Sequence, residues 1–196
     1  SEIVETNHGT RALRRPLEVV LDESQITEGG LTVETSLDFT LQRAIEKLVT
    51  NTPLPDDCQM AAIALDPRNG DILGIVGCRE ENPSGFNRAL DSYRDLGRNI
   101  AEPLIATVAM ERGHVPIKEN PVATGRQLHP GDAVKLMGRY GFSKKLNPGD
   151  DLYRGAISAS LLEVATAYAT ILEGGSRPAP VFVRKVENGQ NTLFTR

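Results

Sequence analysis

In residues 31–36 the positions Leu31, Val33 and Thr35 alternate with the more polar positions Thr32, Glu34 and Ser36. This period of two is typical of a half-buried β-strand. From residue 37 onward the apolar positions recur every three or four residues, which predicts an amphipathic helix that ends near Asn51, before two prolines. Asp38 is its expected N-cap. The predicted inward face of this helix is made by Leu37, Leu41, Ala44, Ile45, Leu48 and Val49.

Two apolar runs, Met60–Leu65 and Ile72–Val76, are separated by a short polar segment. In that segment Pro67 can open a turn, and Asn69 and Gly70 can close it with positive φ angles. The pattern predicts a β-hairpin. Because both runs are apolar almost throughout, we expect both faces of the hairpin to be covered, as in a layered arrangement of helices and strands.

Further elements follow from the same rules. Apolar residues at helical spacing predict a helix that ends at Gly113, a short helix over 133–142 and a longer helix over 158–175. Residues 181–186 and 192–194 are expected to form a second hairpin around an Asn-Gly turn. The expected inward face of the longer helix is made by Leu161, Val164, Ala165, Tyr168, Ile171 and Leu172.

Residues 1–30 are polar and irregular, so they are interpreted as an N-terminal linker segment, and residues 31–196 as a single domain. With 5% aromatic residues and no Trp, that domain needs an aliphatic core. The formal net charge of −4 argues against a nucleic-acid partner, which requires a basic surface. No apolar run reaches the roughly 18 residues of a membrane span. Because the chain starts at Ser1, we expect a mature or excised piece of a longer protein.

Candidate ligands for a metal ion or members of a catalytic triad are sparse. His8, His114 and His129 are far apart in the sequence and lie between predicted elements, so we interpret them as surface residues and expect no metal site and no cofactor. Cys58 and Cys78 flank the first hairpin; they can form a disulfide in an oxidising compartment or remain two thiols. Turn and capping roles are expected for the acidic pairs Asp56 and Asp57, Asp66 and Asp71, and Asp150 and Asp151.

Four segments, in order, resemble the transpeptidase domain of bifunctional class A penicillin-binding proteins, the peptidoglycan synthases. They are GGLTVETSLDFTLQRAIE (29–46), AAIALDPRNGDILGIVGC (61–78), FNRALDSYRDLG (86–97) and AISASLLEVATAYATILEGG (156–175). The resemblance implies an α+β fold, the sandwich of penicillin-binding transpeptidases and β-lactamases, and an extracytoplasmic location, periplasmic or at the cell surface. The family's domain is longer, so its remaining strands would lie beyond Arg196; natural truncation and a fragment are both open.

The resemblance also implies acyl transfer through a serine, with three motifs: S-x-x-K at a helix start, S-x-N, and K-T-G on a strand. None of the three occurs in the sequence. Alignment on Pro103 places Asn99 at the serine position and Glu102 at the lysine position. Alignment on the glycine before the helix places Arg98 and Ala101 there instead. The first alignment is preferred because it needs no gap along the helix.

Neither alignment supplies a nucleophile, so no catalytic residue is expected in this domain. A carboxamide nitrogen has a delocalised lone pair, a guanidinium stays protonated, and Glu102 would have no hydroxyl to activate. Asn99 and Glu102 fit a capping box instead, in which each side chain satisfies a backbone amide at the helix start, with Pro103 in the first turn. The alternative is an active serine acyltransferase that uses an unrecognised serine, with Ser158 and Ser160 as candidates.

The sequence therefore predicts a non-catalytic transpeptidase-like domain of a peptidoglycan synthase, with a scaffold, partner-binding or peptidoglycan-binding role. Its expected partners are a peptidoglycan stem peptide or a cell-envelope protein. A membrane anchor and glycosyltransferase activity are expected only in the full-length parent. Since a two-stranded central sheet would leave one edge unpaired, self-association through that edge is a further expectation.

Overall fold

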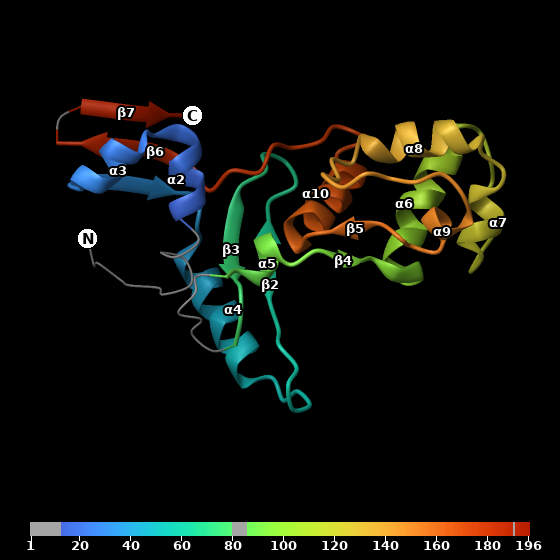
Figure 1. Ribbon diagram of the computed structural model, residues 1–196, viewed down its shortest axis with the longest axis horizontal. Coiled ribbons are helices and arrows are strands. Elements are labelled where there is room, and N and C mark those ends of the chain that lie inside the picture. Colours follow the sequence, from blue (N-terminus) through green and yellow to red (C-terminus); the bar gives the residue numbers. More distant parts are fainter. Residues whose placement is uncertain (1–12, 80–85, 190) are drawn as a thin grey trace. The chain divides into compact units, whose positions relative to one another are not determined.

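In a computed structural model of the protein, the described residues are 13–79, 86–189 and 191–196 (Figure 1). The chain forms two compact units. Unit 1 consists of Ser1–Asp91 together with Ala179–Arg196, and unit 2 consists of Ser92–Pro178. The polypeptide therefore leaves unit 1, builds unit 2 and returns, so that unit 1 depends on pairing between sequence-distant segments.

A three-stranded antiparallel sheet joins the two sequence-distant parts of unit 1 (Figure 1). Its strands, in spatial order, are β1 (Leu31–Thr35), β6 (Val183–Asn188) and β7 (Asn191–Thr195). Val33 pairs with Val186, whose side chain is fully buried, and Val186 also pairs with Phe194. The predicted strand near residue 31 and the second predicted hairpin are confirmed. Local patterns do not predict the pairing of β1 with β6, because these strands lie near opposite ends of the sequence.

Two short helices occupy much of the segment predicted to be irregular. They are α2 (Arg14–Val20) and α3 (Glu23–Glu28). The prediction of irregular chain up to residue 30 is therefore wrong for residues 14–20 and 23–28. The cause is local: the side-chain oxygen of Gln25 accepts the amide of Asp22 at 3.0 Å, and the side chain of Leu21 is buried. A helix start with a reciprocal cap and an adjacent apolar anchor is stable even in a short segment.

Unit 1 also contains the first predicted hairpin, which is confirmed as the antiparallel pair β2 (Ala62–Leu65) and β3 (Ile72–Val76). Burial differs between these strands. Ile75 and Val76 of β3 are almost fully buried, whereas all four residues of β2 are half-buried. The expectation that both strands are covered on both faces is wrong for β2, whose side chains all remain partly exposed.

Helix α4 (Phe39–Asn51) packs against β3 and begins where the sequence predicts. Its N-cap is Asp38, whose carboxylate accepts the amide of Leu41 at 2.9 Å. The predicted inward face is only partly right, since Ala44 is exposed and Leu48 is 61% exposed. The helix is rotated relative to its apolar stripe, and the reason is a polar residue.

Gln42 accounts for this rotation. Its side chain is fully buried, its nitrogen donates to the Ile75 carbonyl at 2.9 Å, and its oxygen accepts the Ile75 amide at 2.7 Å. One side-chain amide thus bonds both backbone groups of a β3 residue, as a neighbouring strand would. A buried strand edge requires hydrogen-bond partners. This requirement outweighs the stability that would be gained by burying Leu48 of the same helix.

Ser36 and Val181 join the hairpin to the sheet within unit 1. The buried Ser36 hydroxyl lies 2.8 Å from the Ile72 carbonyl oxygen and 2.7 Å from that of Val181, and it can donate to either. The Ile72 amide donates to the Val181 carbonyl at 2.8 Å, and the Val181 amide donates to the Gly70 carbonyl at 2.8 Å. The segment that leads into β6 is therefore bonded along the start of β3.

Unit 2 is a group of helices around an aliphatic core. Its elements are β4 (Arg94–Asp95), α6 (Gly97–Glu111), α7 (Pro121–Gly125), α8 (Pro130–Gly138), α9 (Asp150–Tyr153), β5 (Ser158–Ala159) and α10 (Leu161–Leu172), and α5 (Arg88–Asp91) precedes it in unit 1. Its largest fully buried side chains include Leu104, Ile105, Met137, Leu152 and Ile157. The helices predicted over 133–142 and 158–175 are present as α8 and α10 with shifted bounds. Leu172, predicted to face inward, is 73% exposed.

Candidate functional site

The start of helix α6 is the site to which the sequence points. The helix begins at Gly97, two residues before the predicted cap, and the N-cap position is Leu96, whose side chain makes no capping hydrogen bond. Asn99 and Glu102 therefore lie inside the helix, and Pro103 lies in its second turn. The predicted capping box is wrong, as is the placement of the proline in the first turn.

A second segment of unit 2 fixes this helix start. The Gly97 amide donates to the Gly155 carbonyl at 3.1 Å, and the Leu96 amide donates to the Ile157 carbonyl at 3.1 Å. Gly155 has a φ angle of 90°, and a Cβ atom there would overlap the Gly97 carbonyl group. Only glycine lets the two backbones meet at this distance. Distant carbonyls thus satisfy two of the four backbone amides that a helix start leaves without an intrahelical partner.

The first turns of α6 present two different faces. Ala101 and Leu104 are fully buried and anchor the helix in the core of unit 2. Arg98 and Asn99 are exposed, and Glu102 is half-buried. Residues three positions apart on a helix are neighbours on one face. The structure therefore brings Asn99 and Glu102 together at an accessible surface.

The side chains at this helix start offer hydrogen bonds and charge but no nucleophile. Asn99 carries a carboxamide, Arg98 a permanently charged guanidinium, and neither has a hydroxyl for Glu102 to deprotonate. A hydroxyl does approach the backbone here, because Tyr168 donates to the Ile100 carbonyl at 3.0 Å. Burial raises the pKa of Tyr168, which makes its phenolate harder to form.

Ser160, one of the two alternative nucleophile candidates, is the N-cap of α10. Its hydroxyl oxygen accepts the Glu163 amide at 3.3 Å, and the Glu163 carboxylate accepts the Ser160 amide at 3.0 Å. The same carboxylate accepts the Ser143 amide at 3.0 Å. Ser158 lies half-buried on β5. The organising role of Glu163 was missed, although Ser-x-x-Glu before an apolar helix is the signal of a capping box.

Two of the acidic residues for which turn or capping roles are predicted, Asp66 and Asp150, lie in a turn and at a helix start. Asp66 accepts the Arg68 amide at 3.0 Å in the turn between β2 and β3, as predicted. Asp150 lies in the first turn of α9, also as predicted. The hydrogen bond from Arg126 holds the pKa of Asp150 below its usual value. Asp71 has a further partner that the sequence does not reveal.

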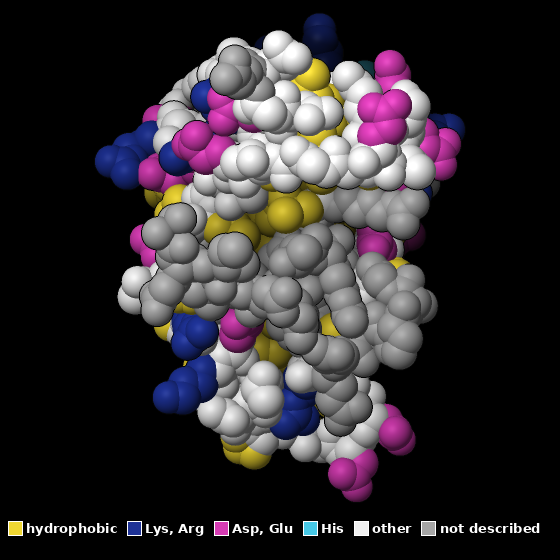
Figure 2. Space-filling model, turned by 90° about the vertical axis from the view of Figure 1, so that its left-hand side faces the viewer, with side chains coloured by type: hydrophobic (Ala, Val, Ile, Leu, Met, Phe, Trp, Pro, Cys, Tyr) yellow, Lys and Arg dark blue, Asp and Glu magenta, His cyan; other side chains and the backbone are white. Residues whose placement is uncertain are grey.

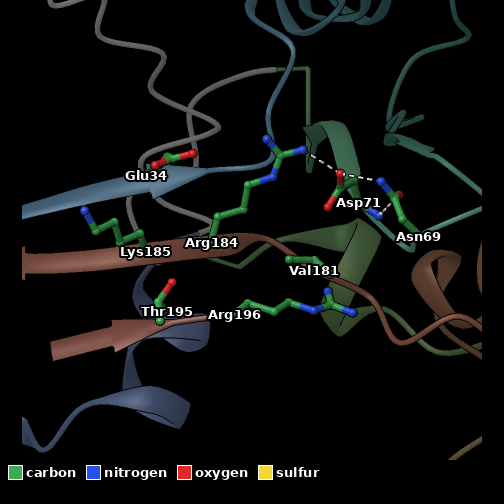
Figure 3. Close-up of a pocket in the computed structure, with 8 residues that line it drawn as sticks. All are labelled: Glu34, Asn69, Asp71, Val181, Arg184, Lys185, Thr195 and Arg196. Carbon is green, nitrogen blue, oxygen red and sulfur yellow. Dashed lines mark hydrogen bonds and ion pairs between the residues drawn. The ribbon is translucent and has the colours of Figure 1, made fainter. Parts of the chain in front are cut away.

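A hollow of about 390 Å³ in unit 1 is the second place where polar side chains converge (Figure 3). It is lined by Glu34, Asn69, Asp71, Val181, Arg184, Lys185, Thr195 and Arg196. Oδ2 of the buried Asp71 accepts from Arg184 at 2.6 Å and from the Asn69 side chain at 2.8 Å. The hydrogen bond to Asp71 raises the pKa of Arg184. Opposite charges in the wall offset one another, so the hollow is chiefly a cross-link between β6 and the β2–β3 turn.

Surface charge does not separate into areas of one sign on the side of the molecule that Figure 2 shows. Acidic and basic side chains are intermingled on the described part of this face. A nucleic-acid interface requires a continuous basic area, which this part of the face does not offer. Within the described residues, no helix combines the length and the hydropathy needed to cross a bilayer.

Among the residues that the structure describes, the histidines and cysteines do not converge on a site. His129 is the N-cap of α8, where its ring nitrogen accepts the Gly131 amide at 3.3 Å. His8 lies outside the described residues. In the described ranges, no three histidine, cysteine or acidic side chains gather as metal ligands would. Cys58 is exposed and Cys78 is buried, and the two are not bonded to each other.

Comparison with solved structures defines the class of fold. The chain has the fold of the transpeptidase domain of penicillin-binding proteins, so the expected α+β class is confirmed. The penicillin-binding protein PonA1 from Mycobacterium tuberculosis matches with a TM-score of 0.75, over 95% of this chain and 63% of that one, at 22% identity. PBPA from the same species matches with a TM-score of 0.64, over 84% of this chain and 57% of that one, at 16% identity.

Sequence comparison identifies a narrower group of related proteins than the fold does. Penicillin-binding protein 1A of Escherichia coli is 27% identical over 177 residues, which is 68% of this chain and 21% of the relative. Penicillin-binding protein 2D of Bacillus subtilis is 25% identical over 210 residues, or 85% of this chain and 30% of the relative. The chain is a homologue of class A penicillin-binding proteins and spans less than a third of either relative. No family model matches it.

Proposed function

We propose that this chain is a non-catalytic transpeptidase-like domain of a peptidoglycan synthase. It acts outside the cytoplasm, in the periplasm or at the cell surface, as a scaffold that binds a cell-envelope protein or a peptidoglycan stem peptide. Homology to penicillin-binding proteins supports the link to cell-wall synthesis. A membrane anchor and a glycosyltransferase domain are proposed for the full-length parent only.

The observation that carries the proposal is the position of Asn99 and Glu102 in the first turns of α6. A serine nucleophile and its lysine must both reach substrate from one helix face. Ala101, which the alternative alignment places at the lysine position, is fully buried, whereas Glu102 is partly accessible. This burial supports the alignment on Pro103. Under that alignment the accessible pair is a carboxamide and a carboxylate, and neither supplies the hydroxyl that a serine acyl-enzyme requires.

The alternative is acyl transfer through another serine. Ser160 is 3% exposed, and its hydroxyl oxygen accepts the Glu163 amide in the first turn of α10. These are the contacts of a helix cap. Ser158 is more accessible but lies on a two-residue strand. A serine needs a base within hydrogen-bond reach, and the carboxylate next to Ser160 is already engaged by the amides of Ser160 and Ser143. These contacts favour the non-catalytic proposal.

Covalent labelling tests the proposal directly. The intact chain is incubated with a fluorescent penicillin, beside a class A penicillin-binding protein as positive control, and both are examined by denaturing electrophoresis and intact mass. We expect label on the control and none on this chain. A stable adduct of one penicillin per chain would overturn the proposal, and its position, compared in Ser158→Ala and Ser160→Ala variants, would identify the nucleophile.

A second measurement separates the two binding roles. Muropeptides with a complete stem peptide are titrated into the chain by calorimetry, with glycan strands that lack the peptide as control. Saturable heat with the muropeptide alone would assign a stem-peptide-binding role. Heat no greater than that of dilution would count against the stem-peptide-binding role.

A further inference from the structure

Each hairpin of unit 1 has an asparagine followed by glycine at its turn. Asn69 and Gly70 lie between β2 and β3, and Asn188 and Gly189 lie where β6 turns toward β7. Asparagine is a chemically labile residue, and a following glycine increases its reactivity because no side chain shields the next backbone nitrogen. The two pairs therefore have the same intrinsic chemistry, and any difference between them comes from the fold.

The fold holds the first pair in place (Figure 3). The side-chain nitrogen of Asn69 donates to Oδ2 of Asp71 at 2.8 Å, and its oxygen accepts the Asp71 amide at 2.9 Å. Gly70 is buried, and its amide donates to the Asp66 carbonyl at 2.9 Å. Arg184 fixes Asp71 in turn, at 2.6 Å. Three hydrogen bonds must therefore break before the Gly70 nitrogen can reach the side-chain carbon of Asn69.

The second pair has much less support. Asn188 and Gly189 are both exposed. Within the described residues, no hydrogen bond holds the Asn188 side chain or the Gly189 amide. Asn188 is the last residue of β6, paired with Leu31 of β1 and Asn191 of β7. Only the terminal pairs of a ladder oppose rotation at this turn, and such pairs open at little cost in free energy.

We propose that Asn188 is a site of spontaneous deamidation and that the fold protects Asn69 from the same reaction. The deprotonated Gly189 nitrogen attacks the side-chain carbonyl carbon of Asn188. The new carbon–nitrogen bond closes a five-membered succinimide ring, and the side-chain nitrogen leaves as ammonia with the proton that the amide lost. Water then opens the ring at one of its two carbonyl carbons, which gives either aspartate or isoaspartate.

The product at Asn188 changes one end of the three-stranded sheet. In isoaspartate the main chain runs through the former side chain and is one carbon longer, so the pairing of residue 188 with Leu31 and Asn191 cannot keep its register. The damage is expected to stay local, because Val186 is fully buried and pairs with Val33. Aspartate leaves the main chain unchanged and adds a negative charge.

The same reaction at Asn69 would damage a contact that joins distant segments. Either product would replace the amide that donates to Asp71 with a second carboxylate beside it. The repulsion between the two carboxylates would weaken the bond between Asp71 and Arg184, which connects the hairpin to β6. The bonds that hold Asn69 therefore protect the residue whose conversion would affect unit 1 most.

Incubation of the intact chain at mildly alkaline pH tests the proposal, with the two sites as internal controls for each other. Samples are digested with pepsin at low pH, where the reaction is slow, and the peptides are sequenced by mass spectrometry. We expect Asn188 to convert at least about tenfold faster than Asn69, which corresponds to about 1.4 kcal/mol of activation free energy. Three hydrogen bonds can contribute this much. In concentrated urea the two rates should become equal.

Two results of this comparison would overturn the proposal. Equal rates in the native chain would show that the bonds of Asn69 give no protection. A difference that persists in urea would show that neighbouring sequence, and not the fold, separates the two sites. Hydrogen exchange gives an independent measurement: the Leu31 amide should exchange faster in chains that contain isoaspartate at residue 188 than in unmodified chains.

Variants then assign the reaction to individual residues. Asn188→Gln keeps a carboxamide but needs a larger ring, so the products in this peptide should disappear; products at the parent rate would mean that Asn191 reacts instead. Asp71→Ala removes an acceptor of Asn69 and should raise conversion at Asn69 several-fold, whereas an unchanged rate in the folded variant would contradict the protective role of Asp71. The comparison in the parent chain needs no variant, so it decides the proposal even if Asp71→Ala does not fold.

Discussion

Arg184 donates to Asp71 at 2.6 Å, and this ion pair joins residues that are 113 positions apart in the sequence. Arg184 lies on β6, and Asp71 follows the turn between β2 and β3. The Asp71 side chain is 9% exposed, while that of Arg184 is 46% exposed. The pair therefore connects the returning C-terminal segment of unit 1 to its hairpin, with the carboxylate on the buried side.

Replacing Arg184 should destabilise unit 1. In Arg184→Gln, a largely buried carboxylate loses its charged donor and retains the neutral amide of Asn69. Leaving a buried charge undercompensated costs several kcal/mol in a dry interior, but here solvent reaches the arginine and screens the pair. We expect the free energy of unfolding to fall by about 1–2 kcal/mol, measured by urea denaturation.

The matched control is the pair formed by Arg68 and Asp66. It has the same 2.6 Å separation, but it joins residues two positions apart, and the Arg68 side chain is 81% exposed. Such a local, solvated pair contributes little to folding. Arg68→Gln should therefore leave the urea midpoint unchanged. A loss as large as that of Arg184→Gln would show that connecting distant segments is not what gives the Asp71 pair its effect.

Gln42→Leu should be among the most damaging substitutions in unit 1. The leucine fits the apolar surroundings, yet it leaves the amide and carbonyl of Ile75 without their partner in a fully buried site. Two unsatisfied backbone groups should cost about 2–4 kcal/mol. Leu48→Gln on the exposed side of the same helix serves as control and should stay within about 0.5 kcal/mol of the parent. Comparable losses in the two variants would refute the edge-closing role of Gln42.

The sequence predicts those parts of the fold that depend on nearby residues. The hairpin of β2 and β3 follows from two apolar runs around an Asn-Gly turn, and Asp38 is recognisable as a cap because it bonds within its own helix. Apolar spacing fails to predict the buried face of α4, because that face is set by the bonds of Gln42 to Ile75 of β3, which lies elsewhere in the sequence. The pairing of Val33 with Val186 is likewise invisible, since alternation reveals a strand but not its neighbour.

Gly155→Ala should disrupt the start of α6. Alanine disfavours a φ angle of 90°, and its Cβ would overlap the carbonyl group of Gly97, so the bond that begins the helix must break or shift. Gly174→Ala is the control: its φ is 62°, and a Cβ there meets no atom within 4 Å. We expect a loss of about 1 kcal/mol for the control and at least about twice that for Gly155→Ala. Thermal unfolding of both variants, compared with the parent, measures the difference.

At the candidate site, the residue types could be predicted and their geometry could not. The sequence shows that Asn99 and Glu102 stand where the family's motif requires serine and lysine. It does not show that the Gly97 amide donates to the Gly155 carbonyl. Without knowledge of that bond, a capping box is the simplest way to supply acceptors for the backbone amides at the helix start. The role of Glu163 was readable, because Ser-x-x-Glu is a local pattern.

Stability should fall at high pH because of Tyr140. Burial raises its pKa to about 12, above the value of about 10 in an unfolded chain. Between these values the native state keeps a proton that the unfolded state has lost, so stability is full below about pH 10 and decreases as the pH rises toward about 12. We expect a loss of about 1–2 kcal/mol across this window after allowance for solvent access. Urea denaturation of Tyr140→Phe should show a shallower decline, and parallel curves would contradict the assignment.

Ser160→Ala distinguishes a cap from a nucleophile. If the hydroxyl serves as the N-cap of α10, its removal leaves the Glu163 amide without its acceptor and should lower the free energy of unfolding by about 1 kcal/mol. Glu163→Gln should cost less, because glutamine can also accept the Ser160 amide. Ser158→Ala, which disturbs no cap, should stay within about 0.5 kcal/mol of the parent. If Ser160→Ala instead left stability unchanged and abolished a measured hydrolysis of a penicillin or a D-Ala-D-Ala peptide, Ser160 would be the nucleophile, and the domain would be an enzyme with its serine at the N-cap of α10.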